Sequence, residues 1–158
     1  MEEIHEVTAT LSHNQVEDCQ PEQDFRQLAI SALELLPEFA VQMDEALAEV
    51  VDMLRVQQEQ EAMARFSALT NDLRWMSLVC DSLDAVLGLD LDGFSNNDSS
   101  AQVRRERFLH LCCEIMDSLE TGDYILFADL LEYELREEIS FWQDLAPTLI
   151  FEAKRPCH

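Results

Sequence analysis

Apolar side chains recur every three or four residues over most of this chain, which is the spacing of helices that bury one face. The clearest stripe runs from Phe66 to Leu87, and Gly88 follows it where glycine commonly ends a helix. Two shorter stripes lie before and after Pro37. Because proline lacks an amide hydrogen and disfavours helix in the residue before it, we expect a break or kink near Leu36.

The second half of the chain opens with a loop. Segment 88–100 is rich in Gly, Ser, Asn and Asp, the residues that favour turns. An amphipathic stretch from Val103 to Leu119 follows, with Ser99 or Ser100 as its N-cap. These features predict a helix that begins immediately after the loop.

The last helix is predicted from its boundary residues as well as from its pattern. Gly122 suits the end of the preceding helix, and Asp123 suits the N-cap of the next one. The apolar pattern then continues from about Tyr124 to Leu145, and we expect Pro147 to end or kink this helix.

These patterns predict an all-α fold. The chain has 158 residues, about one domain, with only three Gly and four Pro. Four substantial helices, a weaker one before Pro37 and short connections predict an antiparallel four- to five-helix bundle. We expect a flexible acidic N-terminal segment over 1–22, the bundle over 23–150 and a frayed tail over 151–158.

The charge limits the partners. Asp and Glu number 33 against 10 Lys and Arg, a net charge of −23. Such a surface repels nucleic acid and anionic membranes and attracts basic proteins. No apolar run approaches the roughly 20 residues that span a bilayer. The start lacks the basic and apolar regions of a signal peptide, and the five cysteines are irregularly spaced. We therefore expect a cytoplasmic protein.

The last helix carries apolar residues on two sides when its residues are placed about 100° apart. One arc is its core stripe, and a second strip lies roughly opposite. A helix of this kind is either central in the bundle or covered by a partner or a second copy of the chain. The core stripe comprises Tyr124, Phe127, Ala128, Leu131, Leu135, Ile139, Trp142 and Leu145. Glu134, Glu137 and Glu138 flank the second strip and favour a basic partner. The candidate partner-binding residues, which include the first two of these glutamates, are Leu126, Leu130, Tyr133, Glu134, Glu137 and Phe141.

The run from Gly122 to Leu135, GDYILFADLLEYEL, resembles a stretch of small acidic helical proteins of bacteria. Some of those proteins are associated with motility or flagellar functions. The resemblance covers only this run and includes no catalytic motif. It implies a bacterial cytoplasmic protein with a supporting role in appendage assembly.

Candidate chemistry is sparse. Di-metal bundles pair a Glu-x-x-His motif on each of two helices with further glutamates, and the chain contains one such motif, Glu2-Glu3-Ile4-His5. His110 has Glu106 and Glu114 one turn away but no glutamate three residues before it. The Asp90–Gly93 loop lacks the other ligands of a calcium loop. We expect no catalytic residues, no metal site and no cofactor.

The sequence therefore favours a non-enzymatic interaction protein, a chaperone or adaptor that binds a basic protein partner through its last helix. Two alternatives remain open. An acidic chain of this kind also suits a nucleic-acid mimic that blocks a DNA-binding protein. A metal-binding helical bundle is the other.

Overall fold

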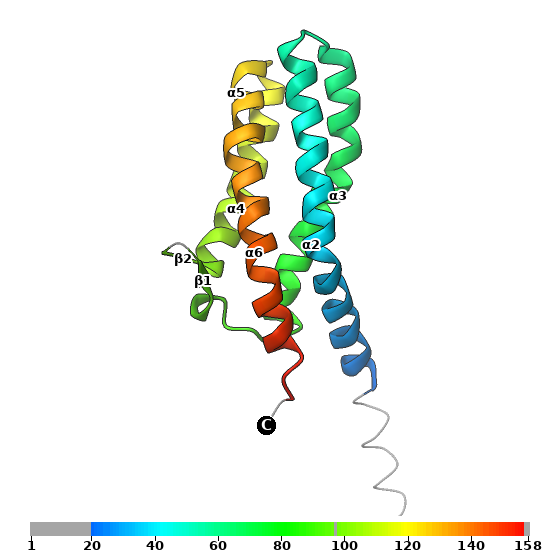
Figure 1. The fold of residues 1–158 in the computed structure, drawn as a ribbon, viewed down its shortest axis with the longest axis vertical. Coiled ribbons are helices and arrows are strands. Elements are labelled where there is room, and N and C mark those ends of the chain that lie inside the picture. The colour runs from blue at the N-terminus through cyan, green and yellow to red at the C-terminus, as the bar shows by residue number, and fades with distance from the viewer. Residues whose placement is uncertain (1–19, 97, 157–158) are drawn as a thin grey trace, which may run out of the picture.

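The computed structural model describes residues 20–96 and 98–156, which form a bundle of long helices lying side by side (Figure 1). The all-α prediction is confirmed. Three of the long helices are α2 (Gln20–Arg55), α3 (Glu59–Ala85) and α4 (Ala101–Glu120). The fourth is a continuous run of α5 (Tyr124–Asp129), a π-helical turn η2 (Leu130–Leu135) and α6 (Arg136–Ala153). The loop before α4 holds a 3-10 turn η1 (Leu91–Gly93) and a two-stranded hairpin of β1 (Ser95–Asn96) and β2 (Ser99–Ser100).

The expected boundaries differ from the structure at both ends. Residues 20–22, which we assigned to the flexible N-terminal segment, belong to α2, and the rest of that segment lies outside the described residues. Residues 151–153, assigned to the frayed tail, form the last turn of α6. None of the described helices combines the length and the apolar character that a membrane span requires.

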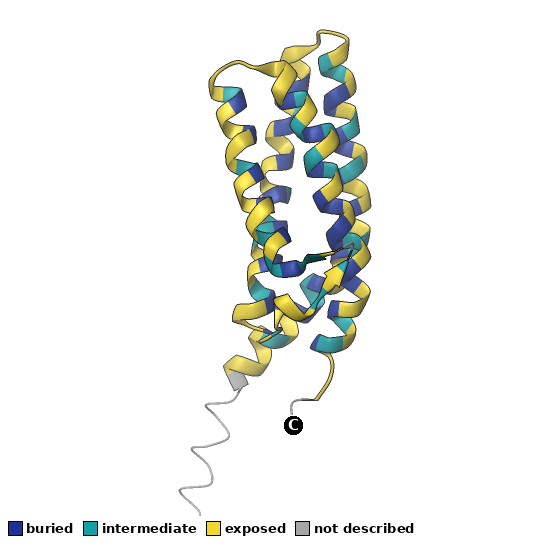
Figure 2. Cartoon of the chain, turned by 90° about the vertical axis from the view of Figure 1, so that its left-hand side faces the viewer, coloured by how far each residue is buried: buried dark blue, intermediate teal, exposed yellow. Residues whose placement is uncertain are grey.

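Buried residues occur along all four long helices, mainly on the sides turned towards the other helices (Figure 2). Helix α2 packs along both α3 and α6, whereas α4 packs mainly on α5 and η2. The core includes large aromatic side chains. Phe66 of α3 and Phe127 of α5 meet edge to face with their ring centroids 4.9 Å apart, a favourable geometry for aromatic pairs.

Pro37 does not break the helix, so the separate helix expected before Pro37 is wrong. Helix α2 continues through it, and Leu33, Leu36 and Ala40 on either side are completely buried. Proline inside a helix costs about 3 kcal/mol. Burial of each of these leucines stabilises the fold by about 1.5–3 kcal/mol, which offsets that cost and keeps the helix continuous. Pro147 likewise lies within α6, which continues to Ala153.

The chain reversals follow local backbone chemistry. The polar stretch after α2 forms a turn in which Gln57 has φ 62°. Gly88 adopts φ 65° just after α3, as its position predicted. The predicted N-caps are also present: Ser100 Oγ accepts from the Val103 amide over 3.3 Å, and Asp123 Oδ1 accepts from the Leu126 amide over 3.0 Å.

Candidate functional site

The core stripe predicted for the last helix is largely buried. Tyr124 is an exception because it remains exposed at the start of α5, and Ala128 is only half-buried. The stripe is therefore buried along the π turn and α6 but only partly buried along α5. The buried members are Phe127, Leu131, Leu135, Ile139, Trp142 and Leu145.

The second apolar strip of this helix divides into two parts. Leu126 and Tyr133 are exposed, with 61% of Tyr133 open to solvent, and Leu130 is half-buried against the core. Phe141 is only 4% exposed, so its assignment to a partner-binding face is wrong. Its ring is covered by the Arg104 guanidinium, whose central carbon lies 4.8 Å from the ring centroid. The part of the strip on α6 is thus covered within the bundle, whereas the part on α5 and η2 remains largely exposed.

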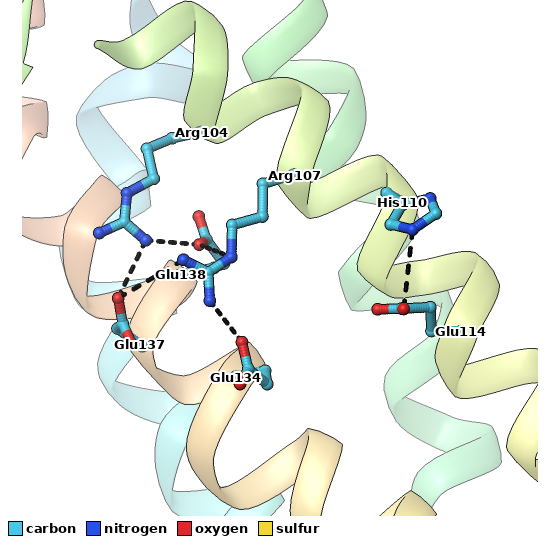
Figure 3. A network of polar contacts seen from close by, with 7 residues as sticks. All are labelled: Arg104, Arg107, His110, Glu114, Glu134, Glu137 and Glu138. Carbon is cyan, nitrogen blue, oxygen red and sulfur yellow. Dashed lines mark hydrogen bonds and ion pairs between the residues drawn. The ribbon is translucent and has the colours of Figure 1, made fainter. Parts of the chain in front are cut away.

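The two candidate glutamates of the strip, Glu134 and Glu137, pair with arginines of α4 (Figure 3). Glu134 pairs with Arg107. Glu137 Oε1 lies 3.0 Å from Arg104 Nη1 and 3.8 Å from Arg107 Nη1. The sequence analysis missed both arginines. Their spacing of three residues on one face of α4, opposite a glutamate-rich helix, was the available signal.

Glu138, the third glutamate expected to flank the strip, is instead the buried centre of this network, so its expected role at a partner-facing border is wrong. Its side chain is fully buried, and its Oε1 accepts a hydrogen bond from Arg104 Nη1 over 2.6 Å. Arg107 Nε lies 3.2 Å from the same oxygen. Burial raises the pKa of the Glu138 carboxyl above its usual range, and the hydrogen bond from Arg104 offsets only part of that shift. Burial lowers the pKa of Arg104, but hydrogen bonds to Glu138 and Glu137 outweigh it and raise the value.

Not every polar atom of the network is paired. Among the described residues, Glu138 Oε2, Arg104 Nε and Trp142 Nε1 are buried without a hydrogen-bond partner. Orphaned buried polar atoms carry a desolvation cost. The network therefore fixes α4 against α6 in one arrangement at a cost in stability.

An exposed apolar surface occupies the α5 end of the bundle. We define the α5 surface as Tyr124, Ile125, Leu126, Leu130 and Tyr133. Ile125, which the sequence analysis did not single out, is 79% exposed. One hollow of about 340 Å³ lies beside Tyr133, between η2 and the end of α2, and another of about 310 Å³ lies beside Leu126, between α4 and α5.

Acidic side chains surround the α5 surface. Asp129 lines the hollow beside Tyr133, and Asp117 lines the hollow beside Leu126. Glu132 is held by Arg55, whose Nη2 lies 2.6 Å from its Oε2. The surface therefore combines apolar contact area with a negative border.

Most of the ten Lys and Arg side chains bind within the fold. Arg136 Nε lies 2.6 Å from Asp44 Oδ1, joining the start of α6 to α2. The guanidinium of Arg26 donates to the carbonyls of Leu87 and Ala153 over 3.1 and 2.8 Å. Because these cations are paired within the fold, the charge that faces solvent is predominantly negative.

The histidine and cysteine side chains that could bind a metal or act as nucleophiles do not form a site among the described residues. His110 Nε2 lies 3.6 Å from Glu114 Oε1 on the exposed side of α4. Over residues 20–96 and 98–156 no group of three or more His, Cys, Asp or Glu is placed to hold a metal ion. The Glu2-Glu3-Ile4-His5 motif lies outside the described residues. Burial raises the pKa of Cys112 to about 11, so this thiol stays protonated at neutral pH.

The fold and its surfaces define an acidic helical bundle. Residues 31–145 match the model of a family described as a domain of unknown function (DUF8042), and the chain belongs to that family. The match extends from the first third of α2 into α6, so it includes the α5 surface and the arginine–glutamate network. No curated protein and no solved structure matched the chain.

Proposed function

We propose that this protein is a non-enzymatic adaptor or chaperone that binds a basic protein partner through the α5 surface. The observation that carries the proposal is the exposure of Ile125, Leu126 and Tyr133 next to two hollows. Exposed apolar patches bordered by polar residues are typical of protein-binding sites. Tyrosine is enriched in such sites because it offers a large rigid contact area with a polar tip.

The acidic border selects the partner. Asp117 and Asp129 lie beside the hollows, and the whole chain carries a charge of −23. A basic partner gains in association rate and specificity from this field. The run 122–135, which resembles a stretch of small acidic bacterial proteins, some of them associated with motility, contains the entire α5 surface. This coincidence supports a role in appendage assembly.

The test is capture of partners from native lysate at moderate salt with three forms of the full chain. These are the wild type, Tyr133→Arg and the control Val103→Arg. Val103 is 54% exposed on α4 and lies outside the α5 surface, so it reports on added charge alone. We expect a stoichiometric protein with the wild type and the control, and loss of that protein with Tyr133→Arg.

Two results would overturn the proposal. Unchanged capture by Tyr133→Arg would remove the α5 surface from the interaction. Capture of a DNA-binding protein that DNA displaces, and that the substitution leaves unchanged, would favour the nucleic-acid mimic. Circular dichroism of each form keeps loss of fold separate from loss of binding.

A further inference from the structure

A second exposed apolar surface runs along the first half of α2. Phe25, Leu28, Ala32, Leu35 and Phe39 follow one another at intervals of three, four, three and four residues. This is the heptad spacing of a coiled-coil seam, which places the side chains in one line along the helix. Leu28 is 67% exposed and Leu35 is 59% exposed, although both lie within a well-formed helix.

Helix α3 widens this line into a surface. Trp75 packs against Phe39 with the ring centroids 4.3 Å apart and the ring planes tilted by 54°. Both rings and Leu35 line a hollow of about 440 Å³. Leu78, one turn beyond Trp75, is also exposed. We define the α2–α3 stripe as Phe25, Leu28, Ala32, Leu35 and Phe39 of α2 with Trp75 and Leu78 of α3.

The stripe is suited to a helical partner. Side chains that follow heptad spacing on one helix receive the side chains of a second helix between them. An amphipathic helix laid along such a surface places its own apolar residues at the same intervals. Leu28 and Leu35 are both more than half exposed, so covering them removes apolar surface from water and favours binding.

The border of the stripe determines the charge of the occupant. Glu38 and Asp72 line the hollow together with Leu35 and Trp75. Asp24 precedes Phe25, and Asp81 lies one turn beyond Leu78. Both are exposed. A second copy of the chain would bring the same acids and another −23 charges to the interface, which costs free energy through like-charge repulsion.

We propose that the α2–α3 stripe binds an amphipathic helix of a partner protein, with aliphatic residues at heptad a and d positions and Lys or Arg at the flanking positions. The aliphatic residues cover Leu28 and Leu35, and one of them enters the hollow beside Trp75. The flanking cations face Glu38 and Asp72. This site is separate from the α5 surface and does not depend on it.

The test uses the full chain and fluorescently labelled peptides of about three heptads, long enough to form a helix on the protein. One peptide has Leu at a and d with Lys at e and g. A second has Glu at e and g, and a third keeps the Lys residues but has Ser at a and d. Binding is measured by anisotropy at about 0.1 M salt, where the screening length is about 10 Å.

We expect the Leu–Lys peptide to bind at least about tenfold more tightly than either comparison peptide. The double variant Leu28→Ser/Leu35→Ser weakens this binding by more than about tenfold, because two apolar contacts are lost. Leu109→Ser is the matched control, since Leu109 is an exposed leucine of α4. It leaves binding unchanged, and so does Tyr133→Arg, which separates this site from the α5 surface.

Three results would overturn the proposal. Equal binding of the Ser peptide would show that charge alone attracts the probe. Equal binding of the Glu peptide would show that the acidic border has no role. Sedimentation of the protein alone as a dimer that the Leu28→Ser/Leu35→Ser variant abolishes would assign the stripe to a second copy of the chain.

Discussion

Arg104 on α4 donates a hydrogen bond over 2.6 Å to Glu138 on α6, a residue 34 positions later whose side chain is completely excluded from solvent. The guanidinium also lies over the ring of Phe141. One arginine therefore neutralises a buried carboxylate and covers a core aromatic ring. This makes the contact between α4 and α6 sensitive to a single side chain.

We expect Arg104→Ala to lower the free energy of unfolding by about 3 kcal/mol, because it leaves the buried Glu138 carboxylate without its shortest hydrogen bond. Arg65→Ala is the control. It removes an exposed ion pair with Glu49 and costs less than about 1 kcal/mol. Urea unfolding followed by circular dichroism measures both, and equal losses would contradict the prediction. The double variant Arg104→Met/Glu138→Leu should regain most of the loss, since apolar side chains can replace a buried ion pair.

The pH dependence of stability should reveal the raised pKa of Glu138. Its value in the unfolded chain is near 4.5, and burial raises it in the folded protein. Between the two values the folded state holds more protons than the unfolded state, so this residue's contribution to stability increases as pH falls. The unfolding free energy of the wild type minus that of Glu138→Gln should therefore rise from neutral pH towards 4.5. A difference that falls on acidification would show that the ion pair outweighs burial.

The two aromatic residues once placed on the same strip should behave differently. Phe141→Ala removes a side chain only 4% exposed and should cost about 4 kcal/mol of stability. Tyr133→Ala removes a side chain 61% exposed and should cost less than about 1 kcal/mol. Chemical unfolding compares the two directly. A large loss for Tyr133→Ala would place that residue in the core and remove it from the α5 surface.

The turn before α5 depends on one glycine. Gly122 has φ 70°, and nothing lies within 4 Å of a Cβ built there, so the strain of a substitution comes from the backbone alone. Gly122→Ala should cost about 1–2 kcal/mol. Gly93→Ala is the matched control because its Cβ would meet Asp90 at an ordinary 3.6 Å. Thermal unfolding should show a lower midpoint temperature for Gly122→Ala. For Gly93→Ala the free energy of unfolding should change by no more than about 0.5 kcal/mol.

Local pattern predicted the long helices and most of their ends. The stripe from Phe66 to Leu87 became α3, and the caps at Ser100 and Asp123 formed because the required side chains precede their helices directly. Pro37 was misjudged for the opposite reason. Its effect was assessed from its own backbone chemistry, whereas the burial of Leu33 and Leu36 depends on helices distant in sequence.

The candidate site could be predicted only in part. Periodicity placed Tyr133 away from the core stripe of the last helix, and its side chain is exposed. The burial of Phe141 required knowledge of Arg104, which belongs to another helix. The exposure of Leu28 and Leu35 was hidden because the whole apolar pattern of α2 was assigned to a single buried face. Only the packing of α3 and α6 determines which apolar residues of α2 are covered.

Because α2 continues through Pro37, its length follows from its number of residues. A helix of 36 residues extends about 54 Å. The first half of α2, which carries the exposed Leu28 and Leu35, runs towards one end of the bundle, and α5 lies at the opposite end (Figure 1). Occupants of the two surfaces would be held apart by a rigid rod, and neither would obstruct the other. A break at Pro37 would have let the two ends of α2 move relative to one another, so the packing that keeps the helix continuous also fixes the spacing between the two surfaces.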